Sequence, residues 1–242
     1  MTRHRFDDIS HISNRLRYLT HLKLGYNYNG DISPLRTMTK LTHLTLGRNF
    51  TDHPITVLDR MSELMYLKIG DNFKQSIEPL RNLPLKTLIV GDNFKPQGRR
   101  IEQTPPERSG RFGFSLGDSV SYTYDDDVLN ALRGAPHDTL EHLEFGNGFN
   151  GSIKSLYGMR NLKYLEFGEG FQQDIVYLRG MTMLQTLIFG DDFRGSITVL
   201  KNVPRLKYLK LGTRHTKEDI SDLPQEFTKL IYGGSDSEYD VE

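Results

Sequence analysis

Histidine and tyrosine residues recur at one position of a repeated motif, and they are the first candidates for chemistry. The residues that share this position, just before the second Leu of the motif, are His21, His43, His142, Tyr66, Tyr164 and Tyr208. His21 and His43 fall on adjacent strands within reach of one another, so a chance metal site is the alternative interpretation. A residue at this position faces solvent on the concave sheet, and we therefore interpret these side chains as outward-facing residues and predict no metal site.

Acidic residues recur in the turns that follow. They are Asp71, Asp92, Asp191 and Asp192, and Glu169 lies in the corresponding turn of another copy. Solenoids that bind calcium use a denser Gly-Asp repeat of shorter period, so we interpret these residues as turn formers. The sequence lacks GxSxG, HExxH, P-loop and dinucleotide-binding signatures. We predict no enzymatic activity, no catalytic residues and no cofactor.

The elements that position these residues are copies of one motif, Leu-x-x-Leu-x-apolar-Gly-x-x-Phe. The copies begin at Leu19, Leu41, Leu64, Leu85, Leu140, Leu162, Leu184, Leu206 and, more weakly, Phe227. Successive copies lie 21 to 23 residues apart, except for a step of 55 residues between Leu85 and Leu140. A fixed period near 22 residues indicates a stacked solenoid, with one insertion.

Each copy predicts one coil of the solenoid. Apolar and polar residues alternate in Leu22-Lys23-Leu24, as is typical of a short strand with one buried face. The Gly that follows indicates a turn in which a Cβ would clash or φ must be positive. An aromatic slot follows, and its seven rings are expected to stack inside the coil: Tyr28, Phe50, Phe73, Phe94, Phe149, Phe171 and Phe193. His215 breaks this series, and we interpret it as part of a loosened coil.

The return half of each coil carries Ile and Leu three residues apart, which indicates a 3₁₀ turn. The fold class is thus an α/β repeat solenoid of about nine coils. A curved parallel sheet is expected on its concave face and short 3₁₀ turns on its convex face. We predict a single domain over residues 1–234, with an N-terminal cap at 1–18 and C-terminal coils at 206–234, followed by a disordered acidic tail at 235–242.

The concave face is the predicted binding surface. Its candidate residues are His21, Lys23, His43, Tyr66, Lys68, His142, Glu144, Tyr164, Glu166 and Tyr208. These outward residues are basic in the early coils and acidic in the middle coils, where Glu141 and Glu169 add to the negative charge. Aromatic residues with interspersed charge favour protein contacts. The alternative is that these residues form a merely solvated face.

Residues 95–127 interrupt the period. Arg99 and Arg100 lie in its basic first part, and the second part predicts a β-hairpin over about 111–124. A three-residue loop at 117–119 would pair Phe114 with Tyr122 and Phe112 with Tyr124, placing the large residues on one face. The hairpin either packs on its own solenoid or binds a partner or a second protomer.

Composition excludes several partners. The chain has 31 basic and 31 acidic residues, which disfavours nucleic acid and acidic membranes as partners. It has no Cys, no apolar leader and no run that approaches a membrane span. We therefore expect a soluble, cytoplasmic protein.

The repeats resemble the leucine-rich repeat at Leu19 to Asn27 and at Leu41 to Asn49. They resemble more closely the 22-residue FNIP repeat, as in Phe189-Gly190-Asp191-Asp192-Phe193 and in residues 145–153. The resemblance covers about 200 residues. It implies a protein of the kind found in amoebae and their large DNA viruses, located in the host cytoplasm if it is viral.

FNIP proteins often carry an F-box that recruits a ubiquitin ligase, but only 18 residues precede Leu19 here, fewer than an F-box needs. We predict a non-enzymatic protein-interaction module that uses its concave face. A homodimer through the insertion or the solenoid edge stays open. The alternative function is a substrate receptor of a ubiquitin ligase that acts through a partner.

Overall fold

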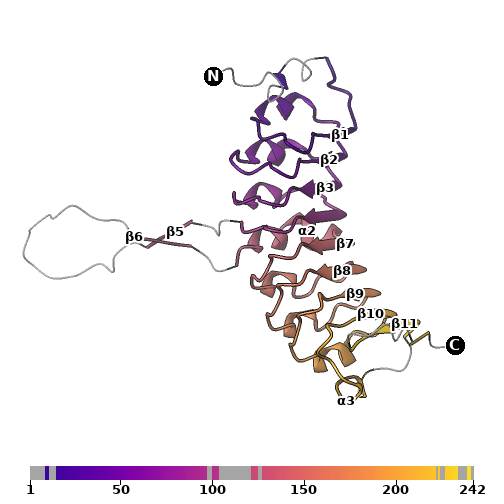
Figure 1. Cartoon of the computed structure of the whole chain (residues 1–242). Helices are drawn as coiled ribbons and strands as arrows, with labels where there is room; N and C mark the ends of the chain where they lie inside the picture. The colour runs from indigo at the N-terminus through magenta and orange to yellow at the C-terminus, as the bar shows by residue number, and fades with distance from the viewer. Residues whose placement is uncertain are drawn as a thin grey trace, which may run out of the picture.

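The computed structural model describes residues 9–10, 15–96, 100–103, 121–124, 127–221, 223, 227–233 and 239–240. Its coils stack one upon another from the N-terminal to the C-terminal end (Figure 1). The strands line one side of the stack, on the inside of its bend, and the 3₁₀ turns line the other side. The predicted repeat solenoid is confirmed.

Within the described residues, nine parallel strands form one continuous sheet. They are β1 (His21–Lys23), β2 (His43–Thr45), β3 (Tyr66–Ile69), β4 (Thr87–Val90), β7 (His142–Phe145), β8 (Tyr164–Phe167), β9 (Thr186–Ile188), β10 (Tyr208–Lys210) and β11 (Lys229–Ile231). Each strand pairs in parallel with its neighbours, and the second Leu of every motif lies opposite the second Leu of the next. The repeat period therefore sets the register, because one coil supplies one strand.

Short turns return the chain behind the sheet. They are η1 (Ser33–Thr37), η2 (Thr56–Arg60), η3 (Glu78–Leu80), η4 (Asn130–Arg133), η5 (Lys154–Leu156), η6 (Val176–Leu178), η7 (Thr198–Asn202), α2 (Ala135–Thr139) and α3 (Lys217–Ile220). The Ile that precedes most 3₁₀ turns and the Leu inside them are buried, as in Ile55 and Leu58. A spacing of three places both side chains on one side of a 3₁₀ turn.

The core is a column of stacked rings between sheet and turns. Centroids of successive rings lie 6.2 Å apart from Phe50 to Phe73 and from Phe73 to Phe94, and 6.0 Å apart from Phe171 to Phe193. The predicted spine is confirmed for these rings. Phe145, Phe167 and Phe189 add a second stacked column beside it, 4.1, 3.9 and 4.1 Å from the first.

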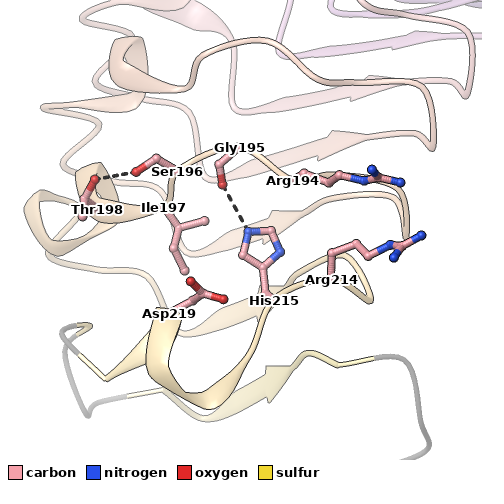
Figure 2. A pocket seen from close by; sticks show the side chains of 8 residues that line it. All are labelled: Arg194, Gly195, Ser196, Ile197, Thr198, Arg214, His215 and Asp219. Carbon is pink, nitrogen blue, oxygen red and sulfur yellow. Dashed lines mark hydrogen bonds between the residues drawn. The ribbon is translucent and has the colours of Figure 1, made fainter.

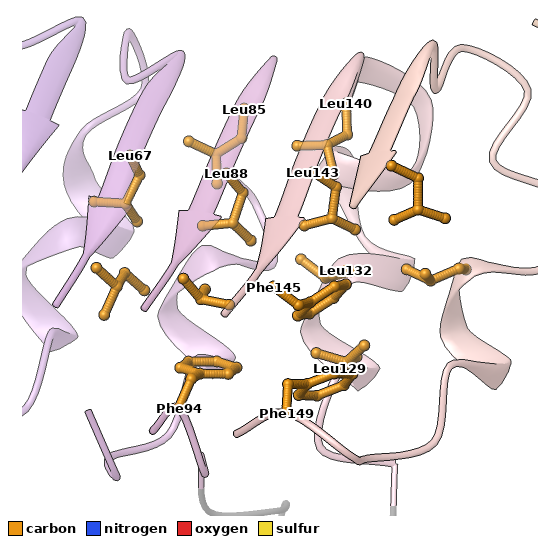
Figure 3. Close-up of a cluster of buried hydrophobic side chains, with 14 of the residues drawn as sticks. Leu67, Leu85, Leu88, Phe94, Leu129, Leu132, Leu140, Leu143, Phe145 and Phe149 are labelled. Atoms are coloured by element: carbon orange, nitrogen blue, oxygen red, sulfur yellow. The ribbon is translucent and has the colours of Figure 1, made fainter. Parts of the chain in front are cut away.

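The core also continues across the insertion. β4 pairs directly with β7, although 51 residues separate Val90 from His142. Figure 3 shows the two coils side by side, with Leu88 beside Leu143 and Phe94 beside Phe149. The insertion therefore leaves the stack without interrupting it.

The repeated turn glycine is required by the close approach of the preceding coil. A Cβ on Gly168 would lie 2.5 Å from the Cα of Asn147, and a Cβ on Gly212 would lie 2.7 Å from the carbonyl oxygen of Asp191. Positive φ angles occur at Gly158, Gly180 and Gly233, of which only the last is a repeat turn glycine. The sequence predicted that this glycine is needed either because a Cβ would clash or because φ must be positive. At Gly168 and Gly212 the reason is the clash.

The structure shows a strand pairing in the insertion that the sequence analysis did not predict. β6 (Ser121–Tyr124) pairs with β5 (Arg100–Gln103), so Tyr122 lies opposite Glu102 and Tyr124 opposite Arg100. The expected partners Phe112 and Phe114 lie outside the described residues, as do residues 117–119 and Arg99. Because β4 and β7 are adjacent, the two ends of the insertion start close together and pair with each other. Figure 1 shows β5 and β6 projecting from the side opposite the parallel strands.

Asp127 anchors the chain where it rejoins the solenoid. Asp127 is 2% exposed, and its carboxylate accepts a hydrogen bond of 2.6 Å from the hydroxyl of Ser155. Arg133 lies 3.5 Å from the same oxygen and donates to the Ser155 hydroxyl at 3.0 Å. η4 has no side-chain cap at its N-terminus, so Asp127 holds the re-entering chain rather than capping the turn.

Two residues of the acidic tail form a short strand. Tyr239–Asp240 form β12, which pairs antiparallel with β11 and places Tyr239 opposite Leu230 and Asp240 opposite Lys229. The rest of 234–242 lies outside the described residues.

Candidate functional site: the concave sheet face

The structure brings the predicted concave-face residues into two parallel rows that run along the sheet. The first row contains His21, His43, Tyr66, Thr87, His142, Tyr164, Thr186 and Tyr208, each in register with the next. The second row contains Lys23, Thr45, Lys68, Ile89, Glu144, Glu166, Ile188 and Lys210, again in register. These rows are the concave-face site discussed below.

The rings of the first row stack on one another in two groups. His21 lies 4.1 Å from His43, which lies 5.5 Å from Tyr66, measured between ring centroids. His142 and Tyr164 lie 4.1 Å apart with an angle of 2° between the ring planes. Except for exposed His21, these rings are half-buried. Stacked rings lose little conformational entropy on binding, because they are already ordered.

Burial and charge shift the pKa of several row members. Burial and the neighbouring charge of His21 lower the pKa of His43. Burial and the charge of Glu144 raise the pKa of Tyr66. Burial raises the pKa of Tyr164 still further, assisted by its hydrogen bond to Glu166. At neutral pH these phenols are therefore protonated and can donate hydrogen bonds.

Two carboxylates stand side by side in the middle of the second row. Glu144 and Glu166 are direct register partners on β7 and β8. Like charges directly opposite one another are unfavourable unless each has a partner. Each carboxylate finds a partner on its own strand: His142 Nε2 lies 2.5 Å from Glu144, and the Tyr164 hydroxyl donates to Glu166. The aromatic row thus holds the acidic pair in place.

The other acidic residues predicted in this region are already engaged. Glu141 lies 2.6 Å from the ammonium nitrogen of Lys163 and 3.9 Å from that of Lys86. The hydrogen bond from Lys163 lowers the pKa of Glu141, despite the opposing effect of burial. Glu169 accepts a hydrogen bond of 2.6 Å from the backbone amide of Asp191. Glu144 and Glu166 are therefore the acidic centre of the concave-face site.

The structure does not bring the insertion residues together with the concave-face site. Arg100 lies in β5, and Tyr122 and Tyr124 lie in β6, on the opposite side of the stack (Figure 1). The structure therefore separates the two candidate surfaces named in the sequence analysis.

A hollow near the C-terminal end was not predicted. Figure 2 shows His215 at its centre, with Arg194 and Arg214 extending in one direction and Asp219 below. The ring of His215 stacks on Phe193 at 5.6 Å and is buried, so it extends the aromatic spine. Its Nε2 donates to the carbonyl of Gly195 at 3.1 Å. The expectation of a loosened coil was wrong at this ring, because imidazole is small and flat enough to occupy the Phe position.

A second hollow lies among the 3₁₀ turns. It is lined by Arg133, Lys154, Tyr157, Val176, Tyr177 and Arg179. Tyr157 and Val176 are 61% and 45% exposed, so this hollow presents apolar side chains to solvent. Sequence analysis missed it because its side chains come from return segments that differ between copies.

The described part of the chain contains no group of three or more His, Asp or Glu residues arranged to hold a metal ion. The same residues include no helix with the length and apolar character that crossing a bilayer requires.

The chain was compared with known proteins. No family model and no curated protein sequence matches it. Solved structures do match. Internalin F of Listeria monocytogenes aligns over 93% of this chain with a TM-score of 0.64 and 21% sequence identity. CroV588, a circular leucine-rich-repeat protein, aligns over 89% with a TM-score of 0.56 and 28% identity. The plant peptide hormone receptor RGFR1 aligns over 93% with a TM-score of 0.50 and 13% identity.

The chain spans 57% of the internalin, 27% of the circular protein and 34% of the plant receptor. All three matches extend along nearly the whole of this chain, so they concern the coils and not a local motif. Together with the nine strands in register, they show that this chain has the fold of a leucine-rich-repeat solenoid.

Proposed function

We propose that this chain is a non-enzymatic protein-interaction module whose concave-face site binds a protein partner in the cytoplasm. The observation that carries the proposal is the acidic pair Glu144 and Glu166, held beside the stacked rings of His142 and Tyr164. Ordered aromatic side chains next to fixed charges are typical of the residues that dominate binding energy at interfaces.

The solved structures add support at the level of the fold. The plant receptor in the comparison is a peptide hormone receptor in complex with RGF2. An extended sheet face suits a protein or peptide better than a small molecule. The comparisons give no support to the ubiquitin-ligase alternative. FNIP relatedness and a viral or amoebal origin stay as proposals that rest on the repeat residues.

The partner is to be isolated by affinity capture from the lysate of the source cell. The bait is the full chain and, in parallel, a chain that lacks residues 96–127. Charge reversal by Glu144→Lys together with Glu166→Lys is expected to weaken binding of the captured partner at least tenfold, since charges in the centre of an interface are worth about 1.4 kcal/mol or more. The melting temperature should change little, because the substitutions remove the repulsion between the two carboxylates together with their contacts to His142 and Tyr164.

The matched control is Asp59→Lys, a charge reversal on η2 at the other side of the stack, where the Asp59 side chain is 56% exposed. This variant should bind the partner as the native chain does. Unchanged affinity in the Glu144 and Glu166 variant, with loss of binding on removal of residues 96–127, would move the site to the insertion.

A further inference from the structure

The second row of the concave-face site contains an order of residue types that is the same in both directions along the stack. One residue comes from each of β3, β4, β7, β8, β9 and β10, and each is the register partner of the next; they are Lys68, Ile89, Glu144, Glu166, Ile188 and Lys210. The order is basic, apolar, acidic, acidic, apolar, basic. Stacking creates this order, because each coil contributes only one of its members.

Two isoleucines flank the acidic pair on the solvent side of the sheet. Ile89 and Ile188 are half-buried, whereas Leu88 and Val90 on the inward side of β4 are buried. The repeat does not require an apolar residue at this position, since β2 has Thr45 there, in register with the second row. The isoleucines therefore offer apolar contact area on both sides of the two carboxylates.

The acidic pair can be reached from solvent. The Glu144 side chain is 31% exposed although it contacts His142, and Glu166 is half-buried beside Tyr164. An ionised carboxylate can accept about four hydrogen bonds, so these contacts use part of the capacity of each. Two neighbouring negative charges on one face attract a single cation placed between them.

The guanidinium group of an arginine suits this position better than the ammonium group of a lysine. It is planar, carries five N–H donors, and can donate to two carboxylates at once. It also stacks on aromatic faces, and the rings of His142 and Tyr164 lie beside the two carboxylates. A lysine supplies a compact charge without this fork of donors.

Strand spacing determines which conformation of a bound segment can reach the whole order. Neighbouring strands lie about 4.8 Å apart, so six successive positions span about 24 Å. Alternate residues of an extended peptide point the same way and lie about 6.6 Å apart, so five of them span about 26 Å. Centred on the acidic pair, the first and last lie near the two lysines, the second and fourth near the two isoleucines, and the third between the two glutamates.

We propose that the concave-face site binds an extended segment of a partner protein with the residue order acidic-x-apolar-x-Arg-x-apolar-x-acidic. The inference rests on the function proposed above and specifies the chemistry of the partner. The arginine lies between Glu144 and Glu166. Lys68 is the stronger of the two outer contacts, because Lys210 lies 3.3 Å from Asp191, which offsets part of its charge.

A second copy of the same face does not fit this site. The order is the same in both directions, so two such faces centred on one another would place glutamate against glutamate and lysine against lysine. The complementary order must come from a different surface.

The test uses a synthetic probe peptide, Glu-Ser-Leu-Ser-Arg-Ser-Leu-Ser-Glu, with a fluorescent label, and fluorescence anisotropy with the full chain. The control peptide exchanges the first Glu with the Arg and has the same composition. The native chain should bind the probe at least tenfold more tightly than the control, because the control places a carboxylate between Glu144 and Glu166. A probe with Lys in place of Arg should bind at least threefold more weakly. Equal binding of the probe and the control would overturn the proposal.

Variants of the chain test which residues read the probe. Glu144→Gln together with Glu166→Gln should abolish the preference for the probe over the control peptide, and Asp59→Asn, a matched change on η2, should retain it. Ile89→Thr together with Ile188→Thr should weaken binding of the probe at least threefold through loss of apolar contact. A preference that survives in the glutamine variant, or unchanged affinity in the threonine variant, would contradict the assigned contacts.

This test can fail independently of the proposed function. If the probe fails to bind while the captured partner still protects Tyr164 from hydroxyl-radical oxidation, the residue order is refuted and the binding surface stands. If the partner also leaves Tyr164 unprotected, both are refuted.

Discussion

The imidazole of His142 and the phenol of Tyr164 lie face to face on neighbouring strands, with centroids 4.1 Å apart. Each ring also contacts the carboxylate two residues further along its own strand, Glu144 for His142 and Glu166 for Tyr164. Four side chains on β7 and β8 therefore fix one another. The centre of the concave-face site is ordered before any partner binds, which lowers the entropic cost of binding.

Alkaline pH is predicted to destabilise the fold through Tyr164. Its pKa in the folded chain is raised above the ordinary value of 10.0, first by burial and then by Glu166. The folded state thus holds the phenolic proton more tightly than the unfolded state. The stabilisation is fully present below pH 10 and is lost as pH rises toward the folded pKa.

Thermal melts at increasing pH measure this loss, and Tyr164→Phe, which keeps the ring but has no proton to release, should show a smaller decline above pH 10. Parallel curves for the two proteins would show that Tyr164 makes no such contribution.

The turn glycines are predicted to differ in their tolerance of a methyl group. Gly168→Ala should lower the free energy of unfolding by about 1–3 kcal/mol, because the new Cβ would lie 2.5 Å from the backbone of Asn147. Gly25→Ala is the matched control: it makes the same change at the same repeat position, where no atom lies within 4 Å. Urea unfolding of both variants measures the difference, and equal losses would refute the stacking argument.

Removal of one ring from the aromatic spine is predicted to be costly. Phe171 is fully buried, and its ring stacks with Phe149, Phe167 and Phe193. Phe171→Ala should lower the free energy of unfolding by about 3–5 kcal/mol, the usual cost of a large cavity in a core. Tyr157→Ala removes an exposed aromatic ring and should change the free energy of unfolding by less than about 0.5 kcal/mol. Comparable effects of the two substitutions in urea unfolding would show that the spine is not close-packed.

The buried carboxylate at the end of the insertion is predicted to stabilise the junction of β4 and β7. Asp127→Ala removes the acceptor of the Ser155 hydroxyl and the ionic partner of Arg133. We expect a loss of about 1–3 kcal/mol, the cost of leaving a buried polar group without its partner. Arg133→Ala should cost less, because its side chain is 50% exposed. Unfolding measurements that rank the two variants in the opposite order would contradict this account.

Much of the fold could be predicted from the sequence because one coil is a small unit that repeats. The spacing of Leu41, Leu44 and Leu46 encodes a strand with an inward face, and all three are buried. Repetition also fixes the register, which single strands rarely encode. The positions of His142, Glu144, Tyr164 and Glu166 on one face followed from the same period.

What the sequence could not provide is pairing outside the repeat. Tyr122 and Tyr124 alternate with small residues and are compatible with several partners, so the pairing of β6 with β5 depends on where the insertion leaves and rejoins the stack. β12 is too short and too acidic to stand out as a strand until β11 offers it an edge. The contact between His142 and Glu144 depends on side-chain conformations, which the period does not encode.

The most direct test of the concave-face site is hydroxyl-radical footprinting of the chain with and without its captured partner. Oxidation reports the solvent exposure of single side chains, and the site contains Tyr66, Tyr164 and Tyr208, while Tyr157 on the turn side provides an internal control at 61% exposure. Our account predicts protection of the three concave-face tyrosines and unchanged oxidation of Tyr157. Protection of Tyr157 or of the insertion, with the concave-face tyrosines still oxidised, would contradict it.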